Sequence, residues 1–316
     1  MGRTDRPRAR TPILGIVGPT ASGKTDLALA LARTWPVEIL VADSRQVYRG
    51  MDVGTAKPDA EARATVAHHL LDLVELDQPF SVAQWVERAR GLIPQVAARG
   101  HLPMLVGGTG LYVSALLDGH DYAAQPWSPE VRHRLTDELG AAGLAPLAER
   151  LAEADAELAA HTDLDNPRRV LRALERVEAA GGGARPRAEP YRGRVALIGI
   201  SRPREVLRDR IDRRAAGLFD NGLLDEVRDL LAAGHDPRQR PMTGHGYGEA
   251  AAHLAGESSL ERAIEMTARR TRQYAKRQMT WFRRDPRIMW LAAGSAEADD
   301  PELVEGADRL LRAALS

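Results

Sequence analysis

The chain has 316 residues, 44% of them hydrophobic, and its 44 lysines and arginines balance 44 aspartates and glutamates. A neutral chain of this length can bury a sizeable core, and any surface that attracts nucleic acid must be a local basic patch. The absence of cysteine from the sequence excludes disulfides, a cysteine nucleophile and every cysteine-ligated metal centre.

The first twelve residues, MGRTDRPRARTP, form a basic tail that we expect to be disordered. They contain four arginines but no apolar run, so they lack the hydrophobic centre of a secretion signal. No apolar stretch elsewhere approaches the ~20 residues that cross a bilayer. We therefore expect a cytoplasmic protein without a membrane partner, and we expect it to act as a monomer.

The first predicted element is a buried strand, ILGIV (13–17), which leads into a glycine-rich loop and then a helix. The loop fits G-x-x-x-x-G-K-[ST], a pattern in which backbone N–H groups surround phosphates and a lysine adds positive charge. The predicted phosphate-binding residues are Gly18, Pro19, Thr20, Ala21, Ser22, Gly23, Lys24 and Thr25. Thr25 is also the predicted ligand of a Mg²⁺ ion. The motif predicts bound phosphates without identifying the rest of the ligand, and a chance match is the alternative.

Two further buried strands end in residues that suit a ligand site. VEILVADS ends at Asp43, and the strand 104–106 runs into the glycines before Thr109. Ligands bind at the carboxyl ends of strands in an open parallel sheet. Asp43 is therefore a candidate metal partner or general base, and an aspartate that only forms a turn is the alternative. Thr109 stands where many phosphate-loop enzymes carry a metal-holding acid, and that acid is missing.

The chain order of elements predicts a parallel α/β sheet with helices on both faces, because strands and helices alternate. One of these helices starts at Ser81, which forms a capping box with Gln84, and a later helix starts with Asn166 as N-cap and Pro167 at its first position. The alternation stops from about 121 to 178, where only helical spacing occurs, and resumes with a strand at 195–200. RIMWLA near the end is a candidate last strand. The predicted domains are the tail (1–12), the α/β core (13–119 and 194–316) and an all-helical insertion (120–193).

RRTRQYAKRQMTWFRR, residues 269–284, carries seven basic residues and no acidic one. On a helix with ~100° per residue, the basic side chains share one arc of about 160° with Gln273 and Thr280. They are Arg269, Arg270, Arg272, Lys276, Arg277, Arg283 and Arg284. This arc predicts a cationic stripe that binds a nucleic-acid backbone. A solvated face that is balanced by acids elsewhere is the alternative.

Together, these motifs resemble bacterial tRNA dimethylallyltransferases (isopentenyltransferases). The similar segments are GPTASGKT (18–25), DSRQVYRGMDVGTAKP (43–58), HHLLD (68–72), FSVAQW (80–85), GGTGLY (107–112), RALE (172–175), GLLDEV (222–227) and YAKRQMTWFR (274–283). The resemblance implies a nucleotide-kinase-like P-loop core with a helical insertion. It also implies transfer of a dimethylallyl group from its diphosphate to N6 of the adenosine immediately 3′ of the anticodon, in tRNAs reading codons that begin with U.

Residue roles follow from the same resemblance. It assigns Asp43 as the base and Thr109 as a contact of the target nucleotide, with Mg²⁺ and the phosphate loop holding the leaving diphosphate. Arg210 and Arg214, four apart on one helical face, resemble arginines that close over the diphosphate. Together, the resemblance and the basic stripe predict that the tRNA anticodon stem-loop contacts Asp43, Ser44, Arg45, Gln46, Thr109, Arg168, Arg169, Arg172, Met242, Tyr247, Lys276, Arg277 and Arg283. Solvated surface is the alternative for the arginines at 168–172 and at 210 and 214.

The sequence departs from the family at MTGHGYGEA (242–250), which usually reads Arg-x-Ile/Val-Gly-Tyr. Thr243 replaces the arginine and His245 the aliphatic residue, and His245 is also open to a role as a polar core residue. Adjacent His68 and His69 are interpreted as structural, because neighbouring side chains on an element point apart and no third ligand follows.

Two other functions remain as alternatives. An ATP-dependent small-molecule kinase would share the phosphate loop, but the GGTG turn and the basic stripe disfavour it. A non-catalytic RNA-binding ATPase would leave Asp43 without a chemical role.

Overall fold

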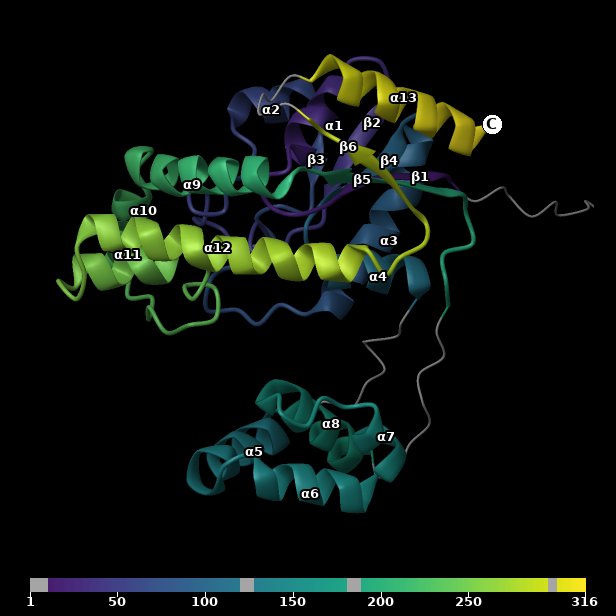
Figure 1. The fold of residues 1–316 in the computed structure, drawn as a ribbon. Coiled ribbons are helices and arrows are strands. Elements are labelled where there is room, and N and C mark those ends of the chain that lie inside the picture. The colour runs from purple at the N-terminus through teal and green to yellow at the C-terminus, as the bar shows by residue number, and fades with distance from the viewer. Residues whose placement is uncertain (1–10, 120–127, 181–188, 295–299) are drawn as a thin grey trace, which may run out of the picture. The chain divides into compact units, whose positions relative to one another are not determined.

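The structure is a computed structural model that describes residues 11–119, 128–180, 189–294 and 300–316 (Figure 1). Most of the predicted basic tail lies outside the described residues. The chain divides into two compact units, one formed by 1–117 with 191–316 and the other by 118–190.

The larger unit is built on a parallel sheet, as the alternation of strands and helices predicts (Figure 1). Within the described residues the sheet has six strands in the order β3-β2-β4-β1-β5-β6. The strands are β1 (Ile13–Val17), β2 (Val37–Val41), β3 (His68–His69), β4 (Leu102–Gly107), β5 (Val195–Ser201) and β6 (Ile288–Ala292). The predicted strands are confirmed, and the two-residue β3 is an edge strand that the sequence pattern did not indicate.

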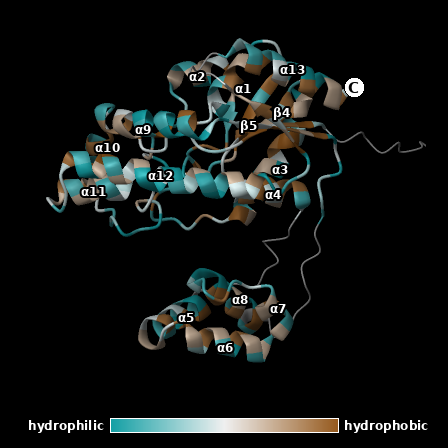
Figure 2. Cartoon of the chain, in the orientation of Figure 1, coloured by the Kyte–Doolittle hydropathy of each residue, from teal (hydrophilic) through white to brown (hydrophobic). Residues whose placement is uncertain are grey.

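Helices cover both faces of this sheet, which is why the residues of β1 and β2 are buried throughout. In Figure 1, α1 and α13 lie over one face and α3 and α4 over the other. The bounds are α1 (Lys24–Ala32), α2 (Ala60–Thr65), α3 (Val82–Ala98), α4 (Gly110–Asp118) and α13 (Pro301–Leu315). Figure 2 shows the apolar strands between these layers, where Leu14, Ile16 and Ile198 pack against Leu31 of α1.

A second group of helices follows β5 and packs beside the sheet. Its members are α9 (Arg204–Asp220), α10 (Leu223–Ala232), α11 (Tyr247–Leu254) and α12 (Leu260–Phe282). The long helix α12 packs against both α9 and α11. It contains most of the predicted basic segment, although Arg283 is the C-cap and Arg284 lies beyond the helix.

The predicted helix caps are present in the structure. The Ser81 hydroxyl accepts a hydrogen bond from the Gln84 N–H at 3.2 Å, and the Gln84 side chain accepts from the Ser81 N–H at 2.9 Å. The Asn166 side chain likewise accepts from the backbone N–H of Arg168 at 3.2 Å. Local hydrogen-bonding chemistry therefore sets these two helix starts, as the sequence predicts.

The smaller unit is helical in its described part. Its helices are α5 (Pro129–Ala142), α6 (Ala145–Ala154), α7 (Ala156–Ala160) and α8 (Pro167–Ala180). They enclose their own apolar core, which includes Leu135, Leu151 and Val170. Glu175 is fully buried against that core and is neutralised by Arg132 and by Arg172, the latter at 3.0 Å.

Candidate active site

The phosphate loop connects β1 to α1 and adopts the left-handed backbone conformations that an anion nest requires. The φ angles are 144° at Gly18, 61° at Ala21 and 96° at Gly23, which is the N-cap of α1. Glycine adopts such angles without strain, whereas Ala21 adopts one against its own preference. A strained residue in this position is typical of a binding loop.

Lys24 is the half-buried cation of this loop. Its Nζ donates a hydrogen bond to the Pro19 carbonyl at 2.6 Å. Burial, reinforced by the nearby Arg214 guanidinium, lowers the pKa of Lys24 to about 7. The lysine is therefore poised between charged and neutral forms, and an anion bound in the loop would favour the charged form.

Two arginines, Arg202 just before α9 and Arg210 within it, donate hydrogen bonds to backbone carbonyls of the phosphate loop. Nε of Arg202 donates to the Ser22 carbonyl and Nε of Arg210 donates to the Ala21 carbonyl, each at 2.8 Å. Arg214 lies deeper, and burial lowers the pKa of its guanidinium. The predicted pair at 210 and 214 thus lies beside the phosphate loop, where two guanidinium groups could close over bound phosphates.

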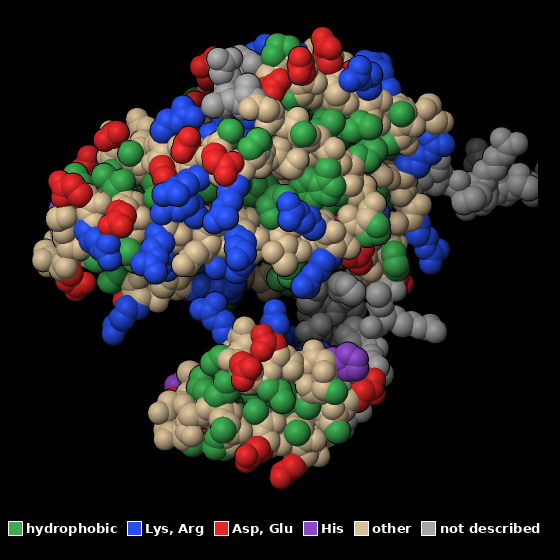
Figure 3. Space-filling view, viewed as in Figure 1, with side chains coloured by type: hydrophobic (Ala, Val, Ile, Leu, Met, Phe, Trp, Pro, Cys, Tyr) green, Lys and Arg blue, Asp and Glu red, His purple; other side chains and the backbone are tan. Residues whose placement is uncertain are grey.

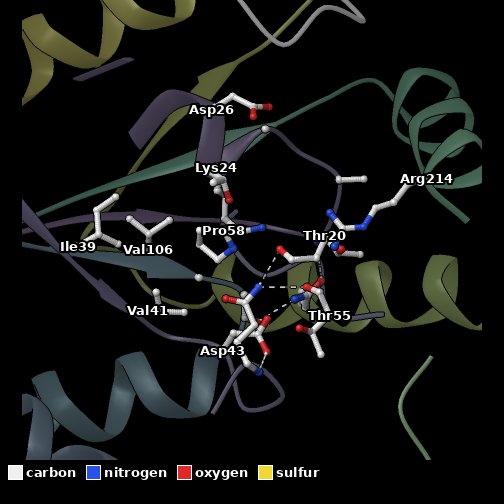
Figure 4. A pocket seen from close by; sticks show the side chains of 18 of the residues that line it. Thr20, Lys24, Asp26, Ile39, Val41, Asp43, Thr55, Pro58, Val106 and Arg214 are labelled. Carbon is white, nitrogen blue, oxygen red and sulfur yellow. Dashed lines mark hydrogen bonds between the residues drawn. The ribbon is translucent and has the colours of Figure 1, made fainter. Parts of the chain in front are cut away.

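A cavity of about 170 Å³ adjoins the loop and brings together residues from seven parts of the chain (Figure 4). Its polar lining comes from the loop, from the carboxyl ends of β2 and β4, from α9 and α12, and from Thr55 and His68. The predicted site residues in its wall are Thr20, Ala21, Gly23, Lys24, Thr25, Asp43, Gln46, Arg210 and Arg214. Ile39, Val41, Val106 and Pro58 add an apolar wall, so the cavity suits a ligand with both an anionic and a hydrocarbon part.

Asp43 lies just beyond the end of β2 and faces this cavity (Figure 4). Its Oδ1 accepts hydrogen bonds from the backbone N–H groups of Arg45 at 2.8 Å and Gln46 at 3.4 Å. The aspartate therefore forms a turn, which was the alternative interpretation, and still contributes to the cavity. Its turn bonds within the described residues use Oδ1, so Oδ2 is the oxygen that can accept a substrate proton.

Thr109 follows β4 and contacts the segment that carries Asp43. Its Oγ1 accepts a hydrogen bond from the Ser44 N–H at 3.0 Å. A Cβ at position 107 would lie 2.1 Å from the Ala42 carbonyl oxygen, so only glycine permits this close approach. The turn therefore brings Thr109 beside Asp43 without supplying a metal-holding acid.

Gln46 and Arg45, two of the predicted tRNA contacts, lie in the loop that follows Asp43, and Gln46 lines the cavity. Nε2 of Gln46 donates to the carbonyls of Thr55 and Ala56 at 3.0 Å and 3.2 Å, which leaves its oxygen as an acceptor. The Arg45 guanidinium donates to the carbonyls of Arg240 and Pro241, and burial lowers its pKa. Arg45 thus ties the loop after β2 to the segment before α11.

The basic stripe is narrower than the sequence predicts. Arg270 forms an ion pair with Glu249 of α11 at 2.6 Å, and Arg272 is paired with Asp212 of α9. The prediction that these two arginines belong to a free cationic face is wrong, because the neighbouring helices supply acids. The exposed members, called the basic stripe below, are Arg269, Gln273, Lys276, Arg277, Thr280, Arg283 and Arg284. Figure 3 shows Lys and Arg side chains gathered over α9 and α12.

Two predicted tRNA contacts are not on the surface. Met242 is 0% exposed and Tyr247 is 1% exposed, so the prediction that their side chains touch RNA is wrong. The Tyr247 hydroxyl lies 2.5 Å from a carboxylate oxygen of Glu226. Glu226 also accepts hydrogen bonds from the N–H groups of residues 52–54. Tyr247 is therefore linked through Glu226 to the loop at 52–54, next to the segment 55–58 that lines the cavity.

His245, the unusual residue of this segment, is a half-buried polar group. Its ring lies 5.2 Å from that of Tyr274, and its Nδ1 is buried without a hydrogen-bond partner among the described residues. Burial, reinforced by Arg270, lowers the pKa of His245 to about 4. The polar-core alternative therefore describes it better than an RNA contact does.

The three predicted arginines of the smaller unit differ in surroundings. Arg168 and Arg169 are exposed at the start of α8, and Arg169 pairs with Asp163 at 3.0 Å. Arg172 is committed to the buried Glu175. Arg168 is thus the most accessible of the three for a phosphate contact.

The structural interpretation of the two adjacent histidines holds for His69 but leaves out part of the role of His68. His69 is structural, because its Nε2 lies 2.6 Å from the buried carboxylate of Glu38. His68 instead lines the cavity. No cluster of three or more His, Cys, Asp or Glu that could hold a metal occurs in the part of the chain that the structure describes.

Sequence reasoning overlooked Gln278, Tyr274 and Arg202. Gln278 and Tyr274 both project from α12 into the cavity wall. A signal was available, because Gln278 shares its helix face with the apolar Ala275 and Phe282, at spacings of three and four residues. A polar side chain on a buried helix face needs hydrogen-bond partners. The partners of Gln278 are the backbone of Thr20 and Gly108, beside the cavity.

Comparison with known proteins identifies the relatives of the chain. The family model described as IPP transferase matches residues 46–285. A tRNA dimethylallyltransferase from Heliobacterium modesticaldum is 42% identical over 298 residues, covering 92% of each chain. The crystal structure of a tRNA isopentenylpyrophosphate transferase from Bacillus halodurans has 36% identity and a TM-score of 0.72, covering 97% of each chain. A eukaryotic dimethylallyltransferase acting on tRNA, 22% identical with a TM-score of 0.74, shares the fold over 96% of this chain and 77% of its own.

None of the helices in the described ranges has the length and apolar character needed to span a bilayer.

Proposed function

The chain belongs to the IPP transferase family, and we propose that it transfers a dimethylallyl group from dimethylallyl diphosphate to N6 of the adenosine immediately 3′ of the anticodon in tRNA. The acceptors are tRNAs that read codons beginning with U. The observation that carries the proposal is the single cavity in which Asp43 and the apolar wall adjoin the phosphate loop. The cavity therefore offers a phosphate-binding loop for an anionic leaving group, an apolar wall for a short hydrocarbon and a carboxylate that can accept a proton.

The reaction breaks the bond between the allylic carbon and the diphosphate oxygen and forms a bond between that carbon and N6. Positive charge builds on the carbon while negative charge builds on the departing diphosphate. Lys24, Arg210 and Arg214 oppose the negative charge, since they surround the loop that holds the diphosphate. Asp43 accepts the proton that N6 loses, which restores a neutral amine.

Mg²⁺ is part of the proposal. Thr25 is exposed toward the cavity in the first turn of α1, and its hydroxyl suits a hard cation. A single protein hydroxyl fits an ion that takes its remaining ligands from diphosphate oxygens and water. The ion, when bound, would neutralise charge on the leaving diphosphate.

The tRNA is proposed to approach the edge formed by Thr109 and the basic stripe. The Arg277 guanidinium lies 5.8 Å from the centre of the Tyr274 ring, and Tyr274 lines the cavity. Exposed cations therefore continue from the cavity wall along α12. The target adenosine would have to leave the stack of the anticodon loop to reach Asp43, as in other enzymes that act on a base.

We also propose that the protein acts as a monomer in the cytoplasm. Sedimentation of the purified protein with and without tRNA tests the first of these statements.

The kinase alternative is disfavoured by the family, since the relatives named above are transferases that act on tRNA. The test is incubation of the protein with labelled dimethylallyl diphosphate, unmodified tRNA and Mg²⁺. Label is expected in the tRNA, at the adenosine next to the anticodon. ATP hydrolysis without transfer of label would overturn the proposal.

A further inference from the structure

Gln278 lies at the junction of three functional segments. Its side chain is only 5% exposed, although it is polar and projects from α12 into the cavity wall. Its Oε1 accepts a hydrogen bond from the Thr20 N–H at 2.8 Å, and its Nε2 donates to the Gly108 carbonyl at 2.9 Å. One amide thus connects the phosphate loop, the turn before Thr109 and the helix of the basic stripe.

The orientation of this amide is unambiguous. A backbone N–H can only donate and a backbone carbonyl can only accept, so both ends of the Gln278 side chain are matched to their partners. A Cβ at position 108 would lie 2.1 Å from Nε2, so any side chain there would displace the amide from this position. Glycine at position 108 therefore leaves the space that the Gln278 amide occupies while it makes both hydrogen bonds.

We infer that Gln278 is a positioning residue that makes donor binding and tRNA binding interdependent. Lys276, Arg277 and Gln278 lie on the same turn of α12. RNA that binds Lys276 and Arg277 therefore contacts the turn whose Gln278 side chain is hydrogen-bonded to Thr20 and Gly108. A shift of that turn changes the peptide orientation at Thr20, in the phosphate loop, and the position of Thr109. Coupling is reciprocal, so bound diphosphate must change RNA affinity by the same factor.

This inference rests on the proposed function but can fail separately from it. The experiment measures the dissociation constant of inorganic pyrophosphate with Mg²⁺, in the absence and in the presence of a saturating anticodon stem-loop. We expect the stem-loop to change the pyrophosphate affinity of the wild-type protein at least about fivefold. In Q278A this factor should fall to near one, while stem-loop affinity alone changes less than about twofold.

Two further variants make the result decisive. Q278M keeps the volume of the side chain and removes both hydrogen bonds, so it should lose coupling even if Q278A folds poorly. Gln95→Ala is the matched control, because Gln95 is an exposed glutamine of α3 whose amide donates a hydrogen bond within its own helix, to the Gly91 carbonyl at 2.9 Å. It should keep the wild-type factor.

The outcomes separate the two proposals. A wild-type factor of one, or an unchanged factor in a folded Q278M, overturns the role of Gln278. Absence of label transfer by the wild-type protein would instead overturn the proposed function.

Discussion

The Oγ1 of Thr109 accepts a hydrogen bond from the Ser44 N–H at 3.0 Å, which joins the ends of β4 and β2 directly beside Asp43. Parallel strands place their carboxyl ends along one edge of a sheet, so residues 65 positions apart in the chain become neighbours. The same edge carries the phosphate loop. This relationship is the structural basis for treating Asp43 and the loop as parts of one reaction centre.

Asp43→Asn should lower turnover of dimethylallyl transfer by ~10²-fold or more, because an amide cannot accept the proton from N6. The amide oxygen can still accept the backbone bonds from residues 45 and 46, so the loop should stay folded and tRNA affinity nearly unchanged. Single-turnover transfer and tRNA binding measure the two effects. Asp77→Asn, an exposed aspartate elsewhere, is the control. Unchanged turnover in Asp43→Asn would remove Asp43 as the base.

Reversing two charges of the basic stripe, Lys276→Glu with Arg277→Glu, should weaken tRNA binding and flatten its dependence on salt. Each lost phosphate contact reduces the number of counterions released on binding. The measurement is the dissociation constant over a series of salt concentrations. The matched control is Arg33→Glu with Arg309→Glu, which reverses two exposed charges on the α1 and α13 side of the sheet (Figure 1). Equal effects of the two double variants would show that the stripe does not face RNA.

Pyrophosphate affinity should depend on pH through Lys24. Its pKa of about 7 rises when an anion binds, so binding takes up a proton. Affinity should be greatest below pH 7 and decline by up to about tenfold per pH unit above it. Calorimetry between pH 6 and 9 gives the profile, and Lys24→Arg separates this effect from titration of pyrophosphate, since arginine stays charged. Identical profiles for the two proteins would contradict the role of Lys24.

His245→Ile should stabilise the protein at neutral pH by about 1 kcal/mol, because it removes a buried nitrogen that lacks a hydrogen-bond partner among the described residues. The folded-state pKa of about 4 lies below the unfolded value of 6.5. The wild-type protein should therefore lose roughly 2 kcal/mol as the pH falls from 6.5 to 4, whereas the variant should not lose this part. Urea unfolding at several pH values measures both effects, with the exposed His133→Ala as control. Equal pH slopes in wild type and His245→Ile would refute the assignment.

Much of the α/β core could be predicted from sequence because its signals are local. The strand–glycine–helix order around Lys24, the capping box at Ser81 and the N-cap at Asn166 each depend on residues within a few positions of one another. Hydrophobic runs likewise identified five of the strands. The two-residue strand β3 gave no such signal, because a segment that short has no periodicity.

The amino-acid sequence alone specified the phosphate loop, the buried strands and the acid at the end of β2, since neighbouring residues encode each of them. The fold decided which side chains meet: Gln278 reaches Thr20 across 258 residues, Arg270 finds Glu249 of α11, and Tyr247 turns inward to Glu226. Helical periodicity tells which residues share a face, but it cannot tell what that face will contact. The partners of a buried polar group come from segments far away in the chain, and packing brings them together.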